Sequence, residues 1–198
     1  MGLPRLIVVT DRGQAGDLVA VVGAAVEAGA TTVLFREKDL PWDSRLALGR
    51  ELVATGAQLL LATDDPATDA SLAYELGAVG LHLSARAGSR RFAGVVGRSC
   101  HSVDGLRRAM EEGAGYATLS PIWVTESKPG YGPALGLEAL AATPLPTYAL
   151  GGVTPGRAGE AVDAGAAGVA VMGAVMTAPD PGAVVRLLRA ELGETVGA

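Results

Sequence analysis

Cysteine, aromatic side chains and clustered positive charge are all scarce in this chain of 198 residues. Cys100 is the only cysteine, which excludes an intrachain disulfide and any zinc site built from several cysteines. Aromatic residues make up 4% of the sequence and hydrophobic residues 49%, so a core of Ala, Val and Leu is expected. The net charge is -5, and basic residues cluster only at Arg86–Arg91, which argues against nucleic acid as a partner.

The amino-terminal segment lacks a long apolar run. Its hydrophobic stretch ends at Thr10, Asp11 and Arg12, too short and too soon charged for a signal peptide or a membrane span. A length of 198 residues suits one sizeable core better than two ordinary domains. We therefore expect one domain over residues 1–198, located in the cytoplasm, with no membrane partner.

Strand-like and helical segments alternate about eight times along the chain. Each parallel return needs a crossover, so the alternation predicts an α/β fold, specifically a (β/α)₈ TIM barrel. The alternative is an open doubly wound sheet, but the first turn, Asp11–Gln14, lacks the expected G-x-G-x-x-G. Residues 84–96 show no clear period. The predicted strands are Leu6–Thr10, Thr31–Lys38, Gln58–Ala62, Val79–Leu83, Arg98–His101, Tyr116–Ser120, Thr147–Leu150 and Gly168–Met172.

Active sites of such barrels lie at the carboxyl ends of the strands, so the polar residues at those ends are the candidates. The second strand places Arg36 and Lys38 on one face and Glu37 on the other, and two cations suit an anionic substrate. The alternative is a solvated charged edge. After the third strand, Asp64 and Asp65 could hold Mg²⁺, or either could cap the next helix.

The fourth and fifth strands carry the two histidines. His82 suits a hydrogen-bonded interior residue at least as well as a catalyst. Ser99 and His101 share a face while Cys100 points away, so the spacing argues against a Cys–His nucleophile pair.

Two further stretches predict phosphate binding. Thr118–Gly136 presents Thr125, Ser127 and Lys128 among glycines and prolines, which suits a phosphate cradle, although an ordinary surface loop is the alternative. The seventh and eighth strands end at Gly151, Gly152, Met172 and Gly173, where backbone amides of a barrel bind phosphate. The set predicts a substrate with two anionic groups.

Seven segments, in order along the chain, resemble the thiamine phosphate synthase superfamily, which also contains thiazole tautomerases. The resemblance implies a TIM barrel in which a pyrimidine pyrophosphate loses pyrophosphate and is captured by the nitrogen of a thiazole phosphate. The matching segments are VVTD near the start, FREK at 35–38, GAVGLHL at 77–83, GRSCHS at 97–102, SPIWVTESKPG at 120–130, ALGGV at 149–153 and GVAVMGAV at 168–175.

Residue roles follow from the resemblance. It assigns pyrophosphate binding to Arg36, Lys38, Ser99 and Lys128, and the thiazole phosphate to Thr125 and Ser127 with the Gly152 and Gly173 amides nearby. It implies Mg²⁺ as cofactor, with Asp64 as one ligand. The partners implied are small phosphorylated substrates, and barrels of this type often form homodimers.

Departures from the synthase pattern keep three functions open. Leu34 replaces Gln, Thr63 replaces Asn, and the second Mg²⁺ carboxylate is missing from residues 84–88, which favours the tautomerase branch. Pro121 stands where a characterised tautomerase has a catalytic His, so His101 or His82 would have to move the proton. The alternatives to a synthase are a tautomerase-like isomerase and a non-catalytic binder of the phosphorylated ligand.

Overall fold

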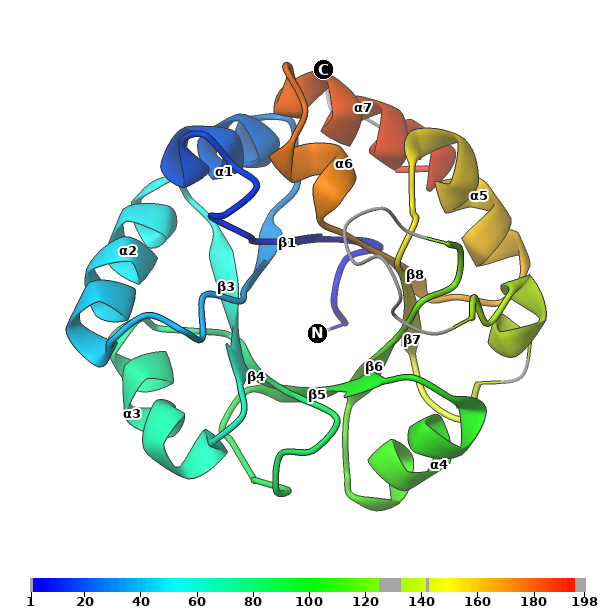
Figure 1. Cartoon of the computed structure of the whole chain (residues 1–198), viewed down its shortest axis with the longest axis horizontal. Helices are drawn as coiled ribbons and strands as arrows, with labels where there is room; N and C mark the ends of the chain where they lie inside the picture. The colour runs from blue at the N-terminus through cyan, green and yellow to red at the C-terminus, as the bar shows by residue number, and fades with distance from the viewer. Residues whose placement is uncertain (1, 125–132, 142, 195–198) are drawn as a thin grey trace.

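The structure, a computed structural model, describes residues 2–124, 133–141 and 143–194. Eight parallel strands form a closed barrel in which each strand pairs with its neighbours in sequence and β1 pairs with β8. Helices surround the barrel, as Figure 1 shows in a view along its axis. The closed ring confirms the TIM-barrel prediction and excludes the open doubly wound sheet.

The elements follow one another in the order expected for this fold. The strands are β1 Leu6–Val9, β2 Thr32–Phe35, β3 Gln58–Thr63, β4 Gly80–Leu83, β5 Val95–Cys100, β6 Tyr116–Leu119, β7 Thr147–Leu150 and β8 Gly168–Val171. The helices are α1 Leu18–Glu27, α2 Trp42–Ala54, α3 Pro66–Glu75, α4 Val103–Glu111, the 3₁₀ turn η1 Leu137–Leu140, α5 Pro155–Asp163, α6 Gly173–Met176 and α7 Pro181–Glu191.

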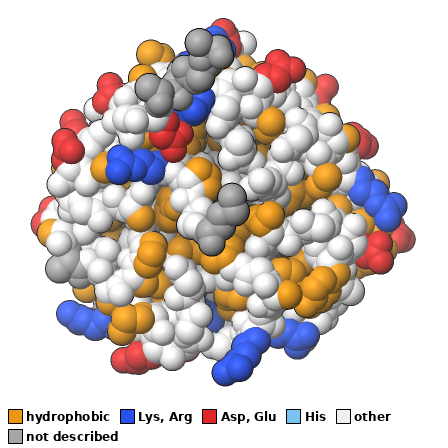
Figure 2. Space-filling view, turned by 180° about the vertical axis from the view of Figure 1, so that it is seen from behind, with side chains coloured by type: hydrophobic (Ala, Val, Ile, Leu, Met, Phe, Trp, Pro, Cys, Tyr) orange, Lys and Arg blue, Asp and Glu red, His pale blue; other side chains and the backbone are white. Residues whose placement is uncertain are grey.

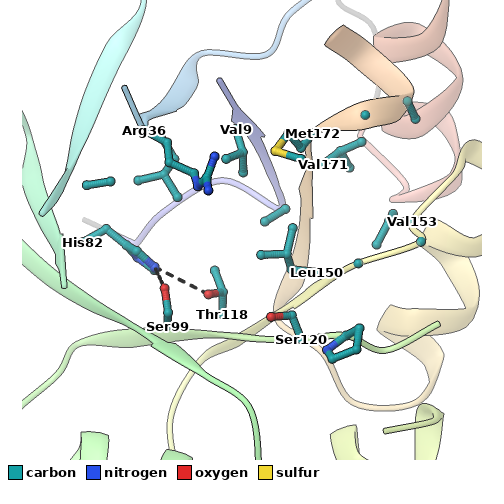
Figure 3. Close-up of a pocket in the computed structure, with 18 of the residues that line it drawn as sticks. Val9, Arg36, His82, Ser99, Thr118, Ser120, Leu150, Val153, Val171 and Met172 are labelled. Carbon is teal, nitrogen blue, oxygen red and sulfur yellow. Dashed lines mark hydrogen bonds between the residues drawn. The ribbon is translucent and has the colours of Figure 1, made fainter. Parts of the chain in front are cut away.

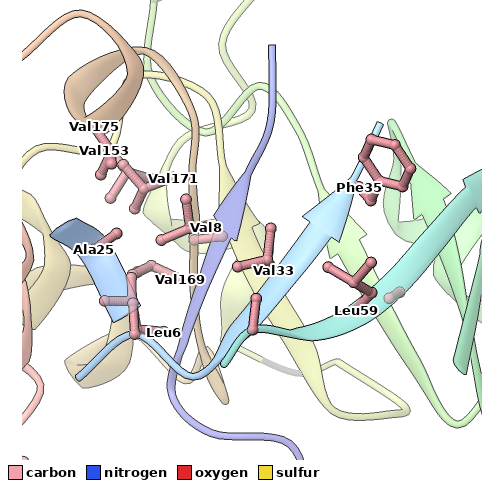
Figure 4. Close-up of a cluster of buried hydrophobic side chains, with 14 of the residues drawn as sticks. Leu6, Val8, Ala25, Val33, Phe35, Leu59, Val153, Val169, Val171 and Val175 are labelled. Atoms are coloured by element: carbon pink, nitrogen blue, oxygen red, sulfur yellow. The ribbon is translucent and has the colours of Figure 1, made fainter. Parts of the chain in front are cut away.

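Most strands are apolar in succession because both of their faces are covered. Ile7 and Val9 of β1 point into the barrel, whereas Leu6 and Val8 point outward against the helices. Figure 4 shows the outward layer of β1, β2, β3 and β8 packed near Ala25 of α1. The barrel therefore has two cores, an inner one of few side chains and an outer one between strands and helices.

The structure corrects several predicted boundaries. β2 ends at Phe35, so Arg36–Lys38 belong to the following loop rather than to the strand. β5 begins at Val95 instead of Arg98, and residues 84–94, for which no helix was predicted, form none. The absence of a clear hydrophobic period in residues 84–96 is consistent with this loop.

Local chemistry explains how the helices begin and end. Asp65 caps α3, because its carboxylate accepts hydrogen bonds from the backbone N–H groups of Ala67 and Thr68. Gly29 and Gly165 follow α1 and α5 with φ of 101° and 110°, a conformation that glycine adopts without a steric penalty. Asp65 is therefore occupied as a helix cap, which leaves Asp64 to face the barrel mouth.

The opposite end of the barrel is closed by the amino-terminal segment. The Tyr148 hydroxyl donates to the Pro4 carbonyl at 2.9 Å, and Arg5 donates to the Leu192 carbonyl at 3.0 Å. Figure 2 shows this face, with charged side chains of both signs around the rim and hydrophobic side chains towards the middle. Within the described ranges, no helix has the length and apolar character needed to cross a membrane.

Candidate functional site

A cavity of about 790 Å³ lies at the carboxyl ends of the barrel strands, where active sites of this fold occur. Its floor has two sides (Figure 3). We call the residues contributed by β1, β2, β3, β7 and β8 the apolar side: Val9, Leu34, Ala62, Leu150 and Ala170. We call the residues on and directly after β4, β5 and β6 the polar side: His82, Ser99, Thr118 and Ser120.

His82 is the centre of the polar side. Its Nε2 lies 2.9 Å from the Ser99 hydroxyl and 3.5 Å from that of Thr118 (Figure 3). Its Nδ1 lies 2.9 Å from the Tyr116 hydroxyl. Burial, together with the nearby cations Lys38 and Arg98, lowers the pKa of His82 to about 3. His82 is therefore a neutral, hydrogen-bonded interior residue at physiological pH.

Arg36 and Lys38 both line the cavity, although they lie beyond the end of β2. The Arg36 guanidinium lies 3.8 Å from the Asp11 carboxylate, and Lys38 Nζ lies 2.6 Å from the Asp64 carboxylate. Glu37 between them is buried and accepts a 2.9 Å hydrogen bond from Arg12. Both cations are about one-third exposed, so they are accessible to an anion at the cavity mouth.

Asp64 does not by itself fit a magnesium site. The hydrogen bond from Lys38, followed by one from Ser84, lowers the pKa of Asp64, so the carboxylate is ionised and already neutralised by a lysine. Across the described residues, no three His, Cys, Asp or Glu side chains gather where they could hold a metal ion. Mg²⁺ prefers six oxygen ligands, and Asp64 offers a single carboxylate on a side chain that is 62% exposed.

The glycine loop after β7 forms the wall across from Arg36. Gly151 and Gly152 have φ of 89° and 70°, and a Cβ on Gly152 would lie 2.7 Å from the Cβ of Trp123. Positive φ and close packing therefore both favour glycine at these two positions. Met172 and Gly173, where α6 begins, line the same part of the cavity.

Arg157 is a cation of the site that the sequence reasoning missed. Its guanidinium donates to the Gly152 carbonyl at 2.7 Å and lies 5.4 Å from the centre of the Trp123 ring. Arg157 lines the cavity from the first turn of α5. Because it follows a helix start rather than a strand, inspection of the strand ends could not find it.

The predicted divergence of Ser99 and Cys100 is confirmed. Ser99 and His101 both line the cavity, while Cys100 is buried in the outer core. Burial raises the pKa of the Cys100 thiol to about 11, which removes it as a nucleophile. His101 is exposed at the cavity wall, and its Nδ1 lies 3.0 Å from the Ser120 carbonyl oxygen.

Three predicted phosphate-binding residues, Thr125, Ser127 and Lys128, lie outside the described residues. The start of their segment does line the cavity, through Pro121 and Val124. All other predicted site residues except Asp64 line this one cavity, and Asp64 is joined to it through Lys38.

Fold and site together define a (β/α)₈-barrel protein with a cavity, lined in part by cations, at the carboxyl ends of its strands. A family model described as thiamine monophosphate synthase matches residues 6–175. The chain therefore belongs to the thiamine monophosphate synthase family, which confirms the resemblance seen in the sequence.

Individual relatives agree with this assignment. The chain is 40% identical to a putative thiamine-phosphate synthase of Geobacter sulfurreducens, over 94% of this chain and 93% of the relative. It is 38% identical to a thiamine-phosphate synthase of Thermus thermophilus, over 85% of each chain. The solved thiamine phosphate pyrophosphorylase of Pyrococcus furiosus superposes with a TM-score of 0.81 at 26% identity, over 98% of this chain and 97% of that one.

Proposed function

We propose that the protein is a thiamine-phosphate synthase, a transferase that joins a pyrimidine pyrophosphate to a thiazole phosphate and releases pyrophosphate. The observation that carries the proposal is that Arg36 and Lys38 at the mouth and Ser99 on the floor line one cavity, which also has an apolar side. Two cations and a hydroxyl suit a pyrophosphate leaving group. Family membership and the names of the relatives supply the reaction type.

The reaction needs charge stabilisation more than proton transfer. The C–O bond to pyrophosphate breaks and the leaving group keeps the electron pair, while the lone pair of the thiazole nitrogen forms the new C–N bond. Arg36 and Lys38 would stabilise the charge that develops on pyrophosphate. The apolar side, which includes Leu34 and Ala170, would exclude water that would otherwise capture the pyrimidine cation.

The thiazole phosphate would bind at the other wall. Backbone amides of Gly151, Gly152, Met172 and Gly173 lie there, and Arg157 adds a positive charge. Thr125 and Ser127 are predicted from the sequence to grip the same phosphate, and Lys128 to reach the pyrophosphate.

Magnesium enters the proposal only as an ion carried by the substrate. Because the described residues do not form a metal site, we derive no step through Mg²⁺. Asp64 remains its predicted single ligand, with pyrophosphate oxygens supplying the rest. A homodimer and a location in the cytoplasm are further predictions from the sequence.

The second candidate is a tautomerase-like isomerase, favoured by the missing second carboxylate after β4. It would require a proton shuttle, for which His101 at the cavity wall is the predicted residue. The buried, neutral His82 suits that role poorly. The names of the relatives favour the synthase.

One assay separates these functions. Pure protein is incubated with pyrimidine pyrophosphate, thiazole phosphate and Mg²⁺, and pyrophosphate release is followed beside interconversion of the carboxylated thiazole phosphate tautomers. Release supports the synthase, and tautomer exchange without release supports the isomerase. If neither pyrophosphate release nor tautomer exchange is detected but thiazole phosphate binds, the protein is a non-catalytic binder.

Two variants test the site within the same assay. Arg36→Ala is expected to lower kcat/KM for pyrophosphate release about 100-fold, because it removes a charge-assisted contact to the leaving group. Arg50→Ala is the matched control, since Arg50 is an exposed arginine of α2 paired at 3.6 Å with Glu75. Equal rates for both variants would contradict the assignment of Arg36.

A further inference from the structure

We propose that Tyr116, His82 and Ser99 form a directional hydrogen-bond relay that fixes the Ser99 hydroxyl as a donor to the anionic group of the substrate. Tyr116 and His82 are positioning residues in this proposal, and only Ser99 touches the ligand. The relay deepens the proposed function and rests on its assignment of Ser99 to pyrophosphate.

The barrel interior is built to admit the Tyr116 ring. A Cβ on Gly97 would lie 2.1 Å from carbons of that ring, so only a glycine on β5 leaves room for it. The ring packs edge-on against Tyr148, with centroids 5.8 Å apart. This placement brings the Tyr116 hydroxyl to 2.9 Å from His82 Nδ1, in a fully buried position.

Burial decides which groups in the relay carry protons. The pKa of Tyr116 is raised well above its usual value by desolvation, and that of His82 is lowered, so both side chains are neutral. A neutral imidazole has one N–H donor and one acceptor nitrogen. Two orders are therefore possible, with the proton on Nδ1 or on Nε2.

The surroundings of Tyr116 favour the proton on Nε2. Within the described part of the chain, the Tyr116 hydroxyl has a hydrogen bond with His82 and with no other group. If Nδ1 carried the proton, the tyrosine hydrogen would be buried without an acceptor, which costs more than an unused lone pair. Tyr116 therefore donates to Nδ1, and Nε2–H donates towards Ser99.

This order sets the chemistry that Ser99 presents to the cavity. Its oxygen accepts from His82 Nε2 at 2.9 Å, so its own hydrogen is directed to another acceptor. Ser99 is half-buried and lines the cavity, where an anion supplies that acceptor. If the His82 proton were on Nδ1 instead, the Ser99 hydroxyl would donate its hydrogen to Nε2. Only oxygen lone pairs would then face the cavity, and these repel an anion.

The tautomer is measured directly by nitrogen NMR on the full chain labelled with ¹⁵N-histidine. We expect His82 to carry its proton on Nε2, and a proton on Nδ1 would overturn the proposal. Tyr116→Phe removes the donor to Nδ1, so His82 should then populate both tautomers. Tyr148→Phe is the matched control, because it also removes a buried hydroxyl, one that is bonded to Pro4 and not to His82.

Affinity for inorganic pyrophosphate tests the consequence for Ser99. Tyr116→Phe and Ser99→Ala should each weaken binding about tenfold, and the double variant should be no weaker than Ser99→Ala alone. Tyr148→Phe should bind as the wild type does. Additive losses from Tyr116→Phe and Ser99→Ala would overturn the relay.

The two measurements separate failure of the relay from failure of the proposed function. A protein that binds pyrophosphate with the expected coupling but catalyses no transfer keeps the relay and loses the synthase assignment. If the wild type does not bind pyrophosphate, the ligand assignment of Ser99 is overturned. The His82 tautomer then still decides the order of the hydrogen bonds.

Discussion

The polar and apolar sides of the cavity floor are built by the same kind of strand but follow different rules. On the apolar side, inward residues such as Leu34 and Ala62 belong to a buried hydrophobic cluster. On the polar side, His82 is equally buried, yet it has a hydrogen bond with the Tyr116 hydroxyl. A buried polar group without a hydrogen-bond partner destabilises the fold, so the polar residues of this side and their partners must be present together.

This difference assigns different tasks to the two sides. The apolar side supplies shape and dryness, for which many side chains would serve. The polar side supplies one oriented hydroxyl, that of Ser99, which is hydrogen-bonded to His82. His82 is in turn bonded to Tyr116, whose ring occupies the space that Gly97 leaves free. Four substitutions or conditions test this division, from the largest expected effect to the smallest.

Gly97→Ala should break the polar side most severely. Its new methyl group would overlap the Tyr116 ring, so we expect the free energy of unfolding to fall by about 3 kcal/mol. Urea denaturation measures the change. Gly88→Ala is the control, because no atom lies within 4 Å of its added Cβ, and a similar loss in both variants would contradict the steric account.

Leu34→Gln places an amide on the apolar side. Leu34 is 3% exposed and belongs to the inner hydrophobic cluster, so desolvation of the amide should lower the free energy of unfolding by about 2 kcal/mol. Leu34→Met, which keeps an apolar group, should cost less. Because the synthase pattern has Gln here, pyrophosphate release is measured on the same protein, and unchanged stability would show that the apolar side accepts polar groups.

Acidification should reveal the buried His82. Unfolded His82 takes up a proton below pH 6.5, whereas in the folded protein its pKa is about 3. The free energy of unfolding should therefore fall as the pH drops below 6.5, by up to about 1.4 kcal/mol per pH unit. Above pH 6.5, His82 should cause no change of stability with pH. Lys38 and Arg98 are among the causes of this low pKa, and the hydroxyls of Tyr116 and Ser99 are hydrogen-bonded to the ring.

The acid effect is isolated by comparison with His82→Gln, which cannot titrate. Urea unfolding of both proteins at about pH 7, 6 and 5 gives the difference attributable to this side chain. Parallel pH profiles in the two proteins would contradict a neutral His82.

Cys100 gives the smallest expected effect. It neighbours Ser99 but points into the outer core, and burial raises its pKa to about 11. Cys100→Ala should change pyrophosphate release less than about twofold, and a thiol reagent should label the native protein far more slowly than the unfolded one. Fast labelling of the native protein would contradict the burial of Cys100.

Much of the fold was predictable because its signals are local. Runs such as LIVV in β1 and the glycines after helices follow from covered strands and helix ends, and they repeat in each βα unit. Between β4 and β5 the sequence showed no clear period, and the structure has a loop there, since a loop can replace a helix without breaking the barrel; only the predicted start of β5 was wrong. Boundaries shifted by a few residues, as in β2, because helix and strand ends depend on tertiary contacts.

The sequence by itself determined the alternation of elements, the strand ends that bear Arg36, Lys38, Ser99 and the glycine loops, and membership of a family. Only the tertiary structure decided which polar groups are partners. The Lys38–Asp64 pair, Arg157 beside Gly152, and the Tyr116–His82–Ser99 chain join residues of different elements. Hydrogen bonds and burial depend on distances across the closed barrel, and no local pattern in the sequence encodes those distances.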